Sequence, residues 1–381
     1  MPLDSAALHE RLFTLDTHSD TPTASFAIEG WDFAARHDYA VDRSQIDLPR
    51  MREGGMDAMV FAVYVPQVAR TPAGHAAVHD LALRHFDRTH GRLRRHAAEC
   101  GLALTADDAL RLKAEGKRAI FLSIENAYSL GRDPANVEKF HRLGVRMLGL
   151  THMLNNDLAD SSTDPRGAEW GGLSPIGREV LAECNRLGIV VDASHASDDV
   201  LRDLLTHSSA PVILSHSDCR AVCDHPRNVG DDLLRALAAK GGVIQMNALA
   251  ISLVPVPGNR RTAATAEVLL RYQDTVISPE MLAAEDRDYH HVAIAHPNPK
   301  VTLEDFIRHI EHAAAVIGPE HVGIGCDLDG GGGGFDGLRD VTDFPRITGA
   351  LVARGWLEPA LAALWGGSTL RLLRAAQRAA G

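Results

Sequence analysis

Short, nearly continuous apolar runs recur along the chain, and longer stretches with apolar residues at helical spacing separate most of them. The apolar positions within a run are continuous rather than alternating, as expected of parallel strands that are covered on both faces. The pattern predicts eight strands, at residues 11–18, 57–65, 118–125, 145–152, 188–195, 211–217, 241–247 and 321–327.

Helix signals fill the intervals between these runs. The pattern predicts helices at residues 72–98, 105–116, 174–188 and 302–318. In the third of these, Ser174 is placed as N-cap, Pro175 at the first helical position and Gly188 at the stop. Thr302, with Asp305 three residues on, resembles a capping box at the start of the fourth.

Eight strand–helix units predict a (β/α)8 TIM barrel, for which about 250 residues is a typical core. We expect the excess length of the 381-residue chain in an insertion between strands seven and eight, at about residues 251–300, and in extra C-terminal helices. Helical content is expected near residues 263–273 of that insertion. No linker divides the sequence, so residues 1–381 are expected to form a single domain. The glycine-rich segment 326–337 is expected to be a flexible loop, because it lacks the strand–turn–helix context of a nucleotide-binding loop.

Composition narrows the function classes. A hydrophobic content of 45% and a charged content of 23% are typical of a soluble globular protein, and the net charge of −11 argues against nucleic-acid binding. The five cysteines form an odd set without small-domain spacing, which indicates reduced thiols. No secretory signal and no apolar stretch of roughly 18–20 residues is visible, so we expect a cytoplasmic protein that does not associate with membranes.

Ionisable residues occur where the predicted strands end. They are His18, Asp20, Glu125, His152, His195, His216 and Asp327. Packing or solvation would explain any one of these histidines, but barrel stability does not require such residues at strand ends. Because the carboxyl ends of barrel strands meet at one mouth, the shared position predicts a metal site there. Asp16, His18 and Asp20 alternate along the first strand and are expected to project from one face.

The ligand types indicate which metal the site would take. Imidazole and carboxylate without thiolate suit zinc, with manganese or cobalt as substitutes. Four histidines and three carboxylates exceed the needs of one tetrahedral ion, so two ions about 3.5–4 Å apart are plausible, with Glu125 as the natural bridge. Cys219 and Cys223 lie just beyond His216, but we interpret them, like Cys326, as buried thiols.

Two arginines follow His216 on a segment expected to face the mouth. Arg220 and Arg227 are each a candidate clamp for a carboxylate or phosphate, because a guanidinium binds such groups through two parallel hydrogen bonds. The alternative for either residue is an ion pair that braces the loop.

Several motifs together resemble the renal or membrane dipeptidase family of metallopeptidases. They are "DTHSD", "SIENAYSLG", "LGLTHMLNNDLADS", "DASHAS", "PVILSHSDCRAVCDHPRN" and "HVGIGCDLDG", and the likeness runs from about residue 11 to 375. The resemblance implies a (β/α)8 barrel with two zinc ions that hydrolyses dipeptides and tolerates a D-residue at the C-terminal position. It also suggests a homodimer.

The same resemblance implies roles for individual residues. His18 and Asp20 would bind one zinc ion, His195 and His216 the other, and Glu125 would bridge the pair.

On the substrate side, His152 would contact the scissile carbonyl, Arg227 would hold the C-terminal carboxylate, and Asp327 would transfer the proton. The expected reaction is amide hydrolysis by a hydroxide between the metals.

Two other readings of the site stay open. One is another amidohydrolase-like enzyme, acting on a cyclic amide, a lactone or a deamination substrate. Many such enzymes have H-x-H on the first strand and a modified lysine on the fourth, whereas this chain has His18-x-Asp20 and Thr151–His152. The other is a barrel that binds metal without catalysis, although every expected ligand is present.

Overall fold

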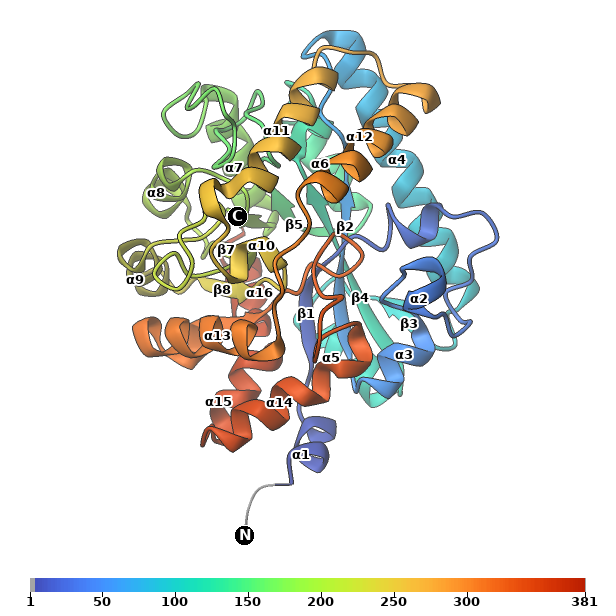
Figure 1. The fold of residues 1–381 in the computed structure, drawn as a ribbon, viewed down its shortest axis with the longest axis vertical. Helices are drawn as coiled ribbons and strands as arrows, with labels where there is room; N and C mark the ends of the chain where they lie inside the picture. The colour runs from blue at the N-terminus through green and yellow to red at the C-terminus, as the bar shows by residue number, and fades with distance from the viewer. Residues whose placement is uncertain (1–3, 381) are drawn as a thin grey trace.

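A ring of parallel strands forms the centre of the computed structural model, which describes residues 4–380 (Figure 1). Its members are β1 (Leu15–Ser19), β2 (Ala58–Tyr64), β4 (Arg118–Glu125), β5 (Val145–Gly149), β6 (Val190–Asp192), β7 (Ile213–Ser217), β8 (Val243–Met246) and β9 (Val322–Ile324). Each strand pairs in parallel with the next in this order. A parallel bridge between Ser19 and Leu328 brings β1 beside the chain that follows β9. The predicted (β/α)8 TIM barrel is therefore confirmed.

All eight predicted strands form, and one further strand was not predicted. This strand, β3 (Cys100–Leu102), pairs in parallel with β4 outside the order of the barrel. It is only three residues long and its sequence is CGL, so it carries too few β-prone residues for a sequence pattern to detect.

Strand β2 illustrates why the apolar runs are continuous. Its residues Met59, Phe61 and Val63 belong to the larger hydrophobic cluster, whereas Ala58 and Val60 belong to a second one. Because successive side chains of a strand point to opposite faces, both faces of β2 are buried. A strand covered on both sides has no position left for an alternating polar residue.

Helices surround the ring (Figure 1). Outside the insertion they are α1 (Ser5–Arg11), α2 (Tyr39–Asp42), α3 (Leu48–Glu53), α4 (Pro72–Arg95), α5 (Ala106–Ala114), α6 (Asn136–Arg142), α7 (Pro175–Leu187), α8 (Asp198–His207), α9 (Asp231–Ala239), α13 (Leu303–Ile317), α14 (Phe344–Ala353), α15 (Glu358–Ala362) and α16 (Ser368–Ala379). The four predicted helices and the extra C-terminal helices are confirmed.

The predicted caps form as well. Ser174 accepts a hydrogen bond from the Gly177 amide at the start of α7, and Gly188 ends this helix with φ at 71°, a conformation that favours glycine. At the start of α13, Thr302 and Asp305 form a reciprocal capping box.

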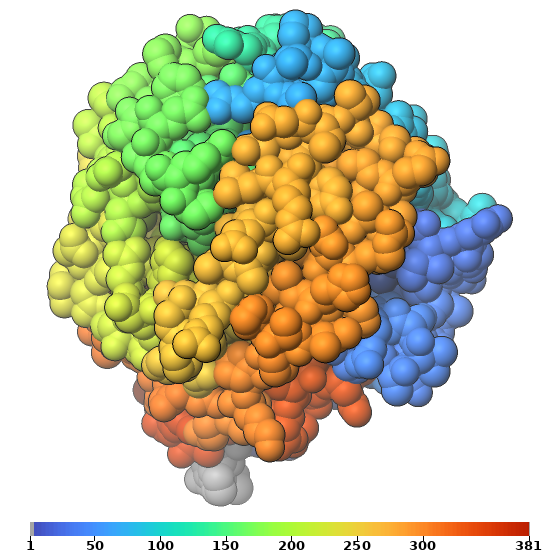
Figure 2. Space-filling model, turned by 45° about the horizontal axis from the view of Figure 1, so that its top comes forward, coloured from blue at the N-terminus to red at the C-terminus, as the bar shows by residue number. Residues whose placement is uncertain are grey.

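The predicted insertion lies between β8 and α13. It contains α10 (Ala250–Leu253), α11 (Arg260–Tyr272) and α12 (Pro279–Ala295), of which α10 and α12 were not predicted. Helices α11 and α12 pack against each other, and the ion pair between Arg271 and Asp288 joins them at 2.9 Å. Figure 2 shows this segment, in gold and orange, as a continuous band of surface that runs across the face in view.

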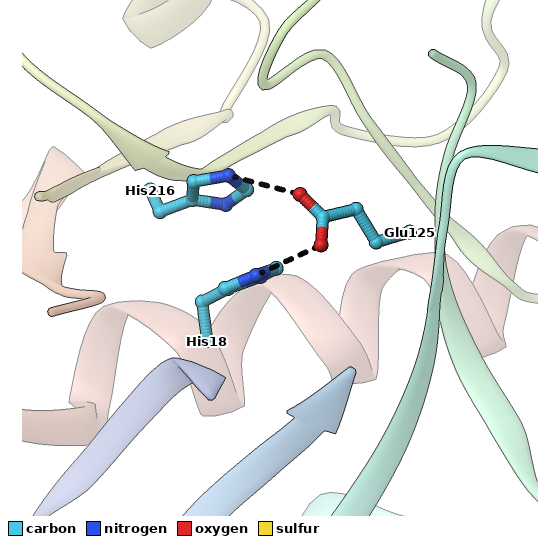
Figure 3. A group of neighbouring side chains, drawn as sticks. All are labelled: His18, Glu125 and His216. Carbon is cyan, nitrogen blue, oxygen red and sulfur yellow. Dashed lines mark ion pairs between the residues drawn. The ribbon is translucent and has the colours of Figure 1, made fainter. Parts of the chain in front are cut away.

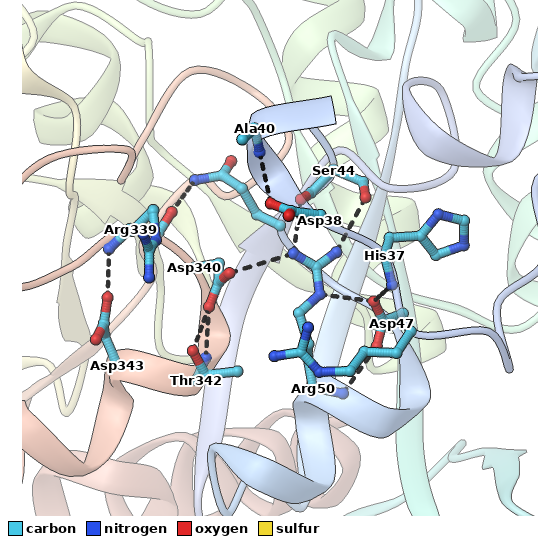
Figure 4. A network of polar contacts seen from close by, with 12 residues as sticks. His37, Asp38, Ala40, Ser44, Asp47, Arg50, Arg339, Asp340, Thr342 and Asp343 are labelled. Carbon is cyan, nitrogen blue, oxygen red and sulfur yellow. Dashed lines mark hydrogen bonds and ion pairs between the residues drawn. The ribbon is translucent and has the colours of Figure 1, made fainter. Parts of the chain in front are cut away.

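A buried polar network attaches the N-terminal part of the chain to the glycine-rich loop after β9 (Figure 4). The Arg50 side chain is buried, its Nε lies 2.6 Å from Asp47, and its Nη1 lies 3.2 Å from Asp340. Gln45 donates hydrogen bonds to the carbonyls of Gly332 and Arg339. Gln45 also exchanges hydrogen bonds with Asp329, so the loop predicted to be flexible, residues 326–337, is held at Asp329 and Gly332.

The five cysteines are buried and unpaired, as their odd count predicted. Within residues 4–380, no helix combines the length and the apolar character needed to cross a membrane. The cytoplasmic location and the single domain stay predictions.

Candidate metal centre and substrate cavity

Glu125, the last residue of β4, lies at the centre of a cluster of histidines (Figure 3). Its Oε2 is 3.5 Å from His18 Nε2, and its Oε1 is 3.5 Å from His216 Nε2. The same Oε1 lies 3.0 Å from His195 Nε2 and 3.9 Å from His152 Nε2. One carboxylate therefore faces four imidazoles that come from four different strand ends.

All seven ionisable residues predicted from the strand ends meet at this mouth. They form three overlapping groups, in each of which the potential ligand atoms lie within 4.8 Å of one another: His18, Glu125 and His216; Glu125, His152 and His195; and His18, Asp20 and Asp327. Because Glu125 and His18 each belong to two groups, the donors form one continuous site rather than separate sites.

Two of these residues, His195 and Asp327, have unusual backbone conformations that set the direction of their side chains. His195 has φ at 69° and Asp327 has φ at 60°, in the left-handed region that non-glycine residues rarely occupy. Gly330 follows in the same loop, where an added Cβ would lie 2.0 Å from Asp20 Oδ2 and 2.2 Å from Asp327 Oδ1. Only glycine leaves room here, because the backbone passes directly beside both carboxylates.

Neighbouring side chains fix the orientation of the ligand-type residues. His216 Nδ1 lies 2.8 Å from the hydroxyl of Ser215, which donates to Asp192. Asp16 accepts hydrogen bonds from the backbone amides of His18 and Cys326. Asp16 therefore fastens β1 to the segment after β9 and is not one of the converging donors, although it alternates with His18 and Asp20.

The donors fit a divalent cation. His18 Nε2 and His216 Nε2 are buried and have no hydrogen-bond partner among residues 4–380. Burial lowers the pKa of His216 well below its usual value, so its imidazole is neutral and keeps a lone pair. Burial would raise the pKa of Glu125, but His18, His195 and His216 hold it well below its usual range, so Glu125 is a carboxylate.

Positive charge in the cluster is scarce beside its three carboxyl groups. Burial and the neighbouring Asp20 and Glu125 raise the pKa of Asp327 well above its usual value. Burial would lower the pKa of His18, but Glu125 and Asp20 raise it well above its usual value, so a proton is held among three carboxylates. A divalent ion would replace that proton with a larger positive charge. Neutral imidazoles and carboxylates are the donor set that zinc takes.

A cavity of about 490 Å³ opens directly beside the cluster. Its barrel side is lined by Asp20, Glu125, His152, His195, Arg227 and Asp327, among others. Arg227 is 7% exposed and donates one hydrogen bond to the His216 carbonyl at 3.1 Å. Arg220 does not line the cavity and instead makes two hydrogen bonds to Asp198, at 2.7 and 2.8 Å. Of the two candidate clamps, Arg227 lies at the site and Arg220 braces the loop.

Part of the cavity wall was not predicted from the sequence. Tyr64, the last residue of β2, packs edge-on against His152 with the ring centroids 4.8 Å apart. Its position could have identified it, because Tyr64 is the penultimate residue of the predicted strand 57–65 and functional side chains of a barrel come from the strand ends. Arg261, Thr265 and Tyr289 reach the cavity from the insertion, in which no motif was recognised.

The cysteines near the site are not part of the cluster. Cys219 donates to the carbonyl of His309, and Cys326 is fully buried. Burial raises the pKa of the Cys326 thiol well above its usual value, so this side chain stays protonated. These contacts agree with the interpretation of the cysteines as buried thiols.

Comparisons with known proteins identify the family of the chain. A model of the membrane dipeptidase family, peptidase family M19, matches residues 4–381. Dipeptidase verJ of Clonostachys rogersoniana is 31% identical over 369 residues, which are 94% of this chain and 83% of that protein. The solved structure of the probable dipeptidase PvdM from Pseudomonas aeruginosa is 28% identical, with a TM-score of 0.83 over 99% of this chain and 98% of that one.

A metallo peptidase from Rhodobacter sphaeroides was solved with a phosphinate mimic of the dipeptide L-Ala-D-Ala. It is 24% identical, with a TM-score of 0.76 over 96% of this chain and 99% of that one, and supports the fold alone. The family match covers nearly the whole chain and agrees with the resemblance seen in the sequence. The chain therefore belongs to the membrane dipeptidase family, peptidase family M19, and is a metallo-dipeptidase.

Proposed function

We propose that this protein hydrolyses the amide bond of dipeptides at a centre of two zinc ions, and that it accepts a D-residue at the C-terminal position. The observation that carries the proposal is the position of Glu125, which faces His18 through one oxygen and His216 through the other. A carboxylate with an imidazole at each oxygen is suited to join two ions.

In this proposal the ligands divide into two sets. His18 and Asp20 would hold one ion, His195 and His216 would hold the other, and Glu125 would contact both. When bound, such ions supply an activated water nucleophile and polarise the carbonyl group.

The chain's own groups would position the substrate and move the proton. Arg227 would donate two hydrogen bonds to the C-terminal carboxylate. His152 would donate an N–H to the carbonyl oxygen, since burial lowers the pKa of His152 to about 4 and keeps the ring neutral. Asp327 would accept a proton from the attacking water and pass it to the leaving amine as the C–N bond breaks.

Two observations support a small peptide as the substrate. A cavity of about 490 Å³ is within the usual range of small-molecule sites. Dipeptidase verJ and the probable dipeptidase PvdM, which are similar to this chain, are both named dipeptidases. The Rhodobacter protein carries a mimic of a dipeptide with a D-residue at its C-terminal position, which makes L,D dipeptides part of the test. The homodimer stays a prediction.

The decisive experiment measures turnover of L,L and L,D dipeptides by zinc-loaded protein, with the metal content determined on the same sample. We expect about two zinc ions per chain and hydrolysis of dipeptides, with no turnover of cyclic amides or lactones. Turnover of cyclic amides or lactones alone would replace the proposal by the amidohydrolase alternative. Full metal content without turnover of any of these substrates would favour a barrel that binds metal without catalysis.

A further inference from the structure

The α11–α12 insertion forms the wall of the cavity that lies away from the barrel. Arg261, Thr262 and Thr265 line it from α11, and Tyr289 and Val292 line it from α12. The band of surface in Figure 2 is the outer side of this wall. A substrate bound between the barrel and this band would therefore contact both.

Arg261 is the charged group of this wall. It is partly buried, and its one hydrogen bond among residues 4–380 runs from Nη1 to the His296 carbonyl at 2.7 Å. No carboxylate of the described residues lies within ion-pair distance of it, whereas Arg271 on the same helix pairs with Asp288. Burial lowers the pKa of the Arg261 guanidinium, and no acidic neighbour opposes the shift.

Besides Asp20, Glu125 and Asp327 of the cluster, one further carboxylate lines the cavity, and it does not balance the charge of Arg261. Asp329 lines the cavity, but its oxygens accept hydrogen bonds from the hydroxyls of Thr21 and Ser25 and from the Gln45 amide. A guanidinium carries five N–H donors in a fixed planar fork, and Arg261 uses one of them within the described protein. The remaining donors have no anionic partner on the wall.

We infer that Arg261 binds a side-chain carboxylate of the substrate, so that the enzyme prefers dipeptides containing aspartate or glutamate. The inference rests on the proposed function, in which Arg227 holds the α-carboxylate on the barrel side of the same cavity. Two guanidinium groups in one small cavity suit a substrate with two carboxylates, because each desolvated cation then gains a partner.

A purely structural role for Arg261 predicts a different result. Its bond to His296 joins the first turn of α11 to the end of α12. If that bond were its whole purpose, a substitution would disturb the wall and weaken binding of all dipeptides to the same extent. Binding of the α-carboxylate by Arg261 would also affect all dipeptides equally. Selective recognition alone changes the ratio between acidic and uncharged substrates.

The test uses matched substrates on the zinc-loaded enzyme: Ala-Asp against Ala-Asn, and Asp-Ala against Asn-Ala. The wild type should have a higher kcat/KM for the acidic dipeptide than for its amide in at least one pair. That pair also shows whether Arg261 binds the side chain of the N-terminal or of the C-terminal residue. Arg261→Gln should lower that acid-to-amide ratio of kcat/KM by roughly tenfold or more, mainly through KM, as expected for a lost charged hydrogen bond. Arg261→Lys should retain part of the preference.

Arg260→Gln is the matched control, because Arg260 precedes Arg261 on α11, is exposed and does not line the cavity. It removes the same charge and should leave the ratio at the wild-type value. Equal ratios in wild type and Arg261→Gln would overturn the inference while dipeptide hydrolysis itself stands. Absence of turnover on all four dipeptides, with zinc bound, would instead overturn the proposed function.

Discussion

The imidazole rings of His18 and His216 lie with their centroids 3.7 Å apart and their planes tilted by 33°, although one comes from β1 and the other from β7. Burial keeps His216 neutral, whereas Glu125 and Asp20 favour a proton on His18, so the pair carries one positive charge. The arrangement is stable when a group of opposite charge accompanies them, and Glu125 lies within 3.5 Å of both. The negative charge of Glu125 therefore stabilises the close approach of the two rings.

Glu125→Gln tests that dependence. The amide keeps the shape of the side chain but removes the charge, so we expect less than two bound zinc ions per chain and a loss of kcat/KM of at least about a hundredfold. Metal analysis and dipeptide turnover measure the two effects. Glu179→Gln, on the exposed face of α7, should change neither. Wild-type metal content and activity in Glu125→Gln would show that Glu125 is no ligand.

Arg227→Ala should raise KM for dipeptides by roughly tenfold to a hundredfold with a smaller effect on kcat, because it removes charged hydrogen bonds to the substrate carboxylate. A dipeptide amide, which lacks that carboxylate, should be a poor substrate of the wild type and nearly insensitive to the substitution. Arg220→Ala is the matched control, since Arg220 pairs with Asp198 outside the cavity. If dipeptide kinetics are the same in Arg227→Ala and wild type, Arg227 is not the clamp.

Removal of metal should abolish activity and lower the melting temperature. Without bound cations, the carboxylates of Asp20, Glu125 and Asp327 repel one another in a buried cluster, and the stabilisation that binding gives the folded state is lost. Activity assays and thermal unfolding before and after chelation measure both effects. Zinc should restore them, with manganese or cobalt as partial substitutes. Full activity in protein that has been stripped of metal would refute metal dependence.

Glu285→Gln should stabilise the protein at pH 8 but not near pH 4.5. Glu285 is 6% exposed on α12, and burial together with Asp286 raises its pKa from 4.5 to about 7. Between these values the folded state keeps a proton that the unfolded state releases, so stability falls as pH rises from about 4.5 to 7. The full penalty above pH 7 is at most about 3 kcal/mol, and the glutamine avoids it.

Thermal unfolding of both proteins at the two pH values measures this effect. Glu267→Gln, at an exposed position on α11, serves as the control and should show no such pH dependence. If the melting temperatures of Glu285→Gln and wild type differ by the same amount at both pH values, Glu285 has an ordinary pKa in the folded protein.

Arg50→Met should lower the free energy of unfolding by about 3–5 kcal/mol, because it leaves Asp47 and Asp340 buried without their cation. Urea unfolding provides the measurement. The exposed pair of Arg36 with Glu53 offers a comparison, and Arg36→Met should cost no more than about 1 kcal/mol. Equal losses in the two variants would contradict the importance of the buried network.

The barrel and its ionisable rim were predictable because each depends on a local signal. Burial on both faces makes a run such as β2 apolar throughout, and the carboxyl ends of the strands bring the ionisable residues to one place. The same logic fails for Asp16, since its position on the strand does not reveal that backbone amides satisfy it.

The cavity wall was less predictable for a different reason. Arg261 and Tyr289 come from two helices of the insertion, and only the packing of α11 against α12 brings them to the cavity. Helix α12 itself had recognisable start signals, namely Ser278 as cap followed by Pro279. No pattern within either helix states which of its side chains meets the barrel.

The two sides of the cavity have separate origins in the chain. The donors come from the ends of six strands of the ring that holds the molecule together, whereas the facing wall is one contiguous excursion that contributes no strand to the ring. That excursion is consequently a unit that can change in sequence without a change in the strands of the ring. Exchange of residues 255–300 for a segment of another sequence should redirect which peptides are chosen and leave the bond-breaking apparatus in place. Selectivity in this enzyme can be engineered, and can evolve, independently of catalysis.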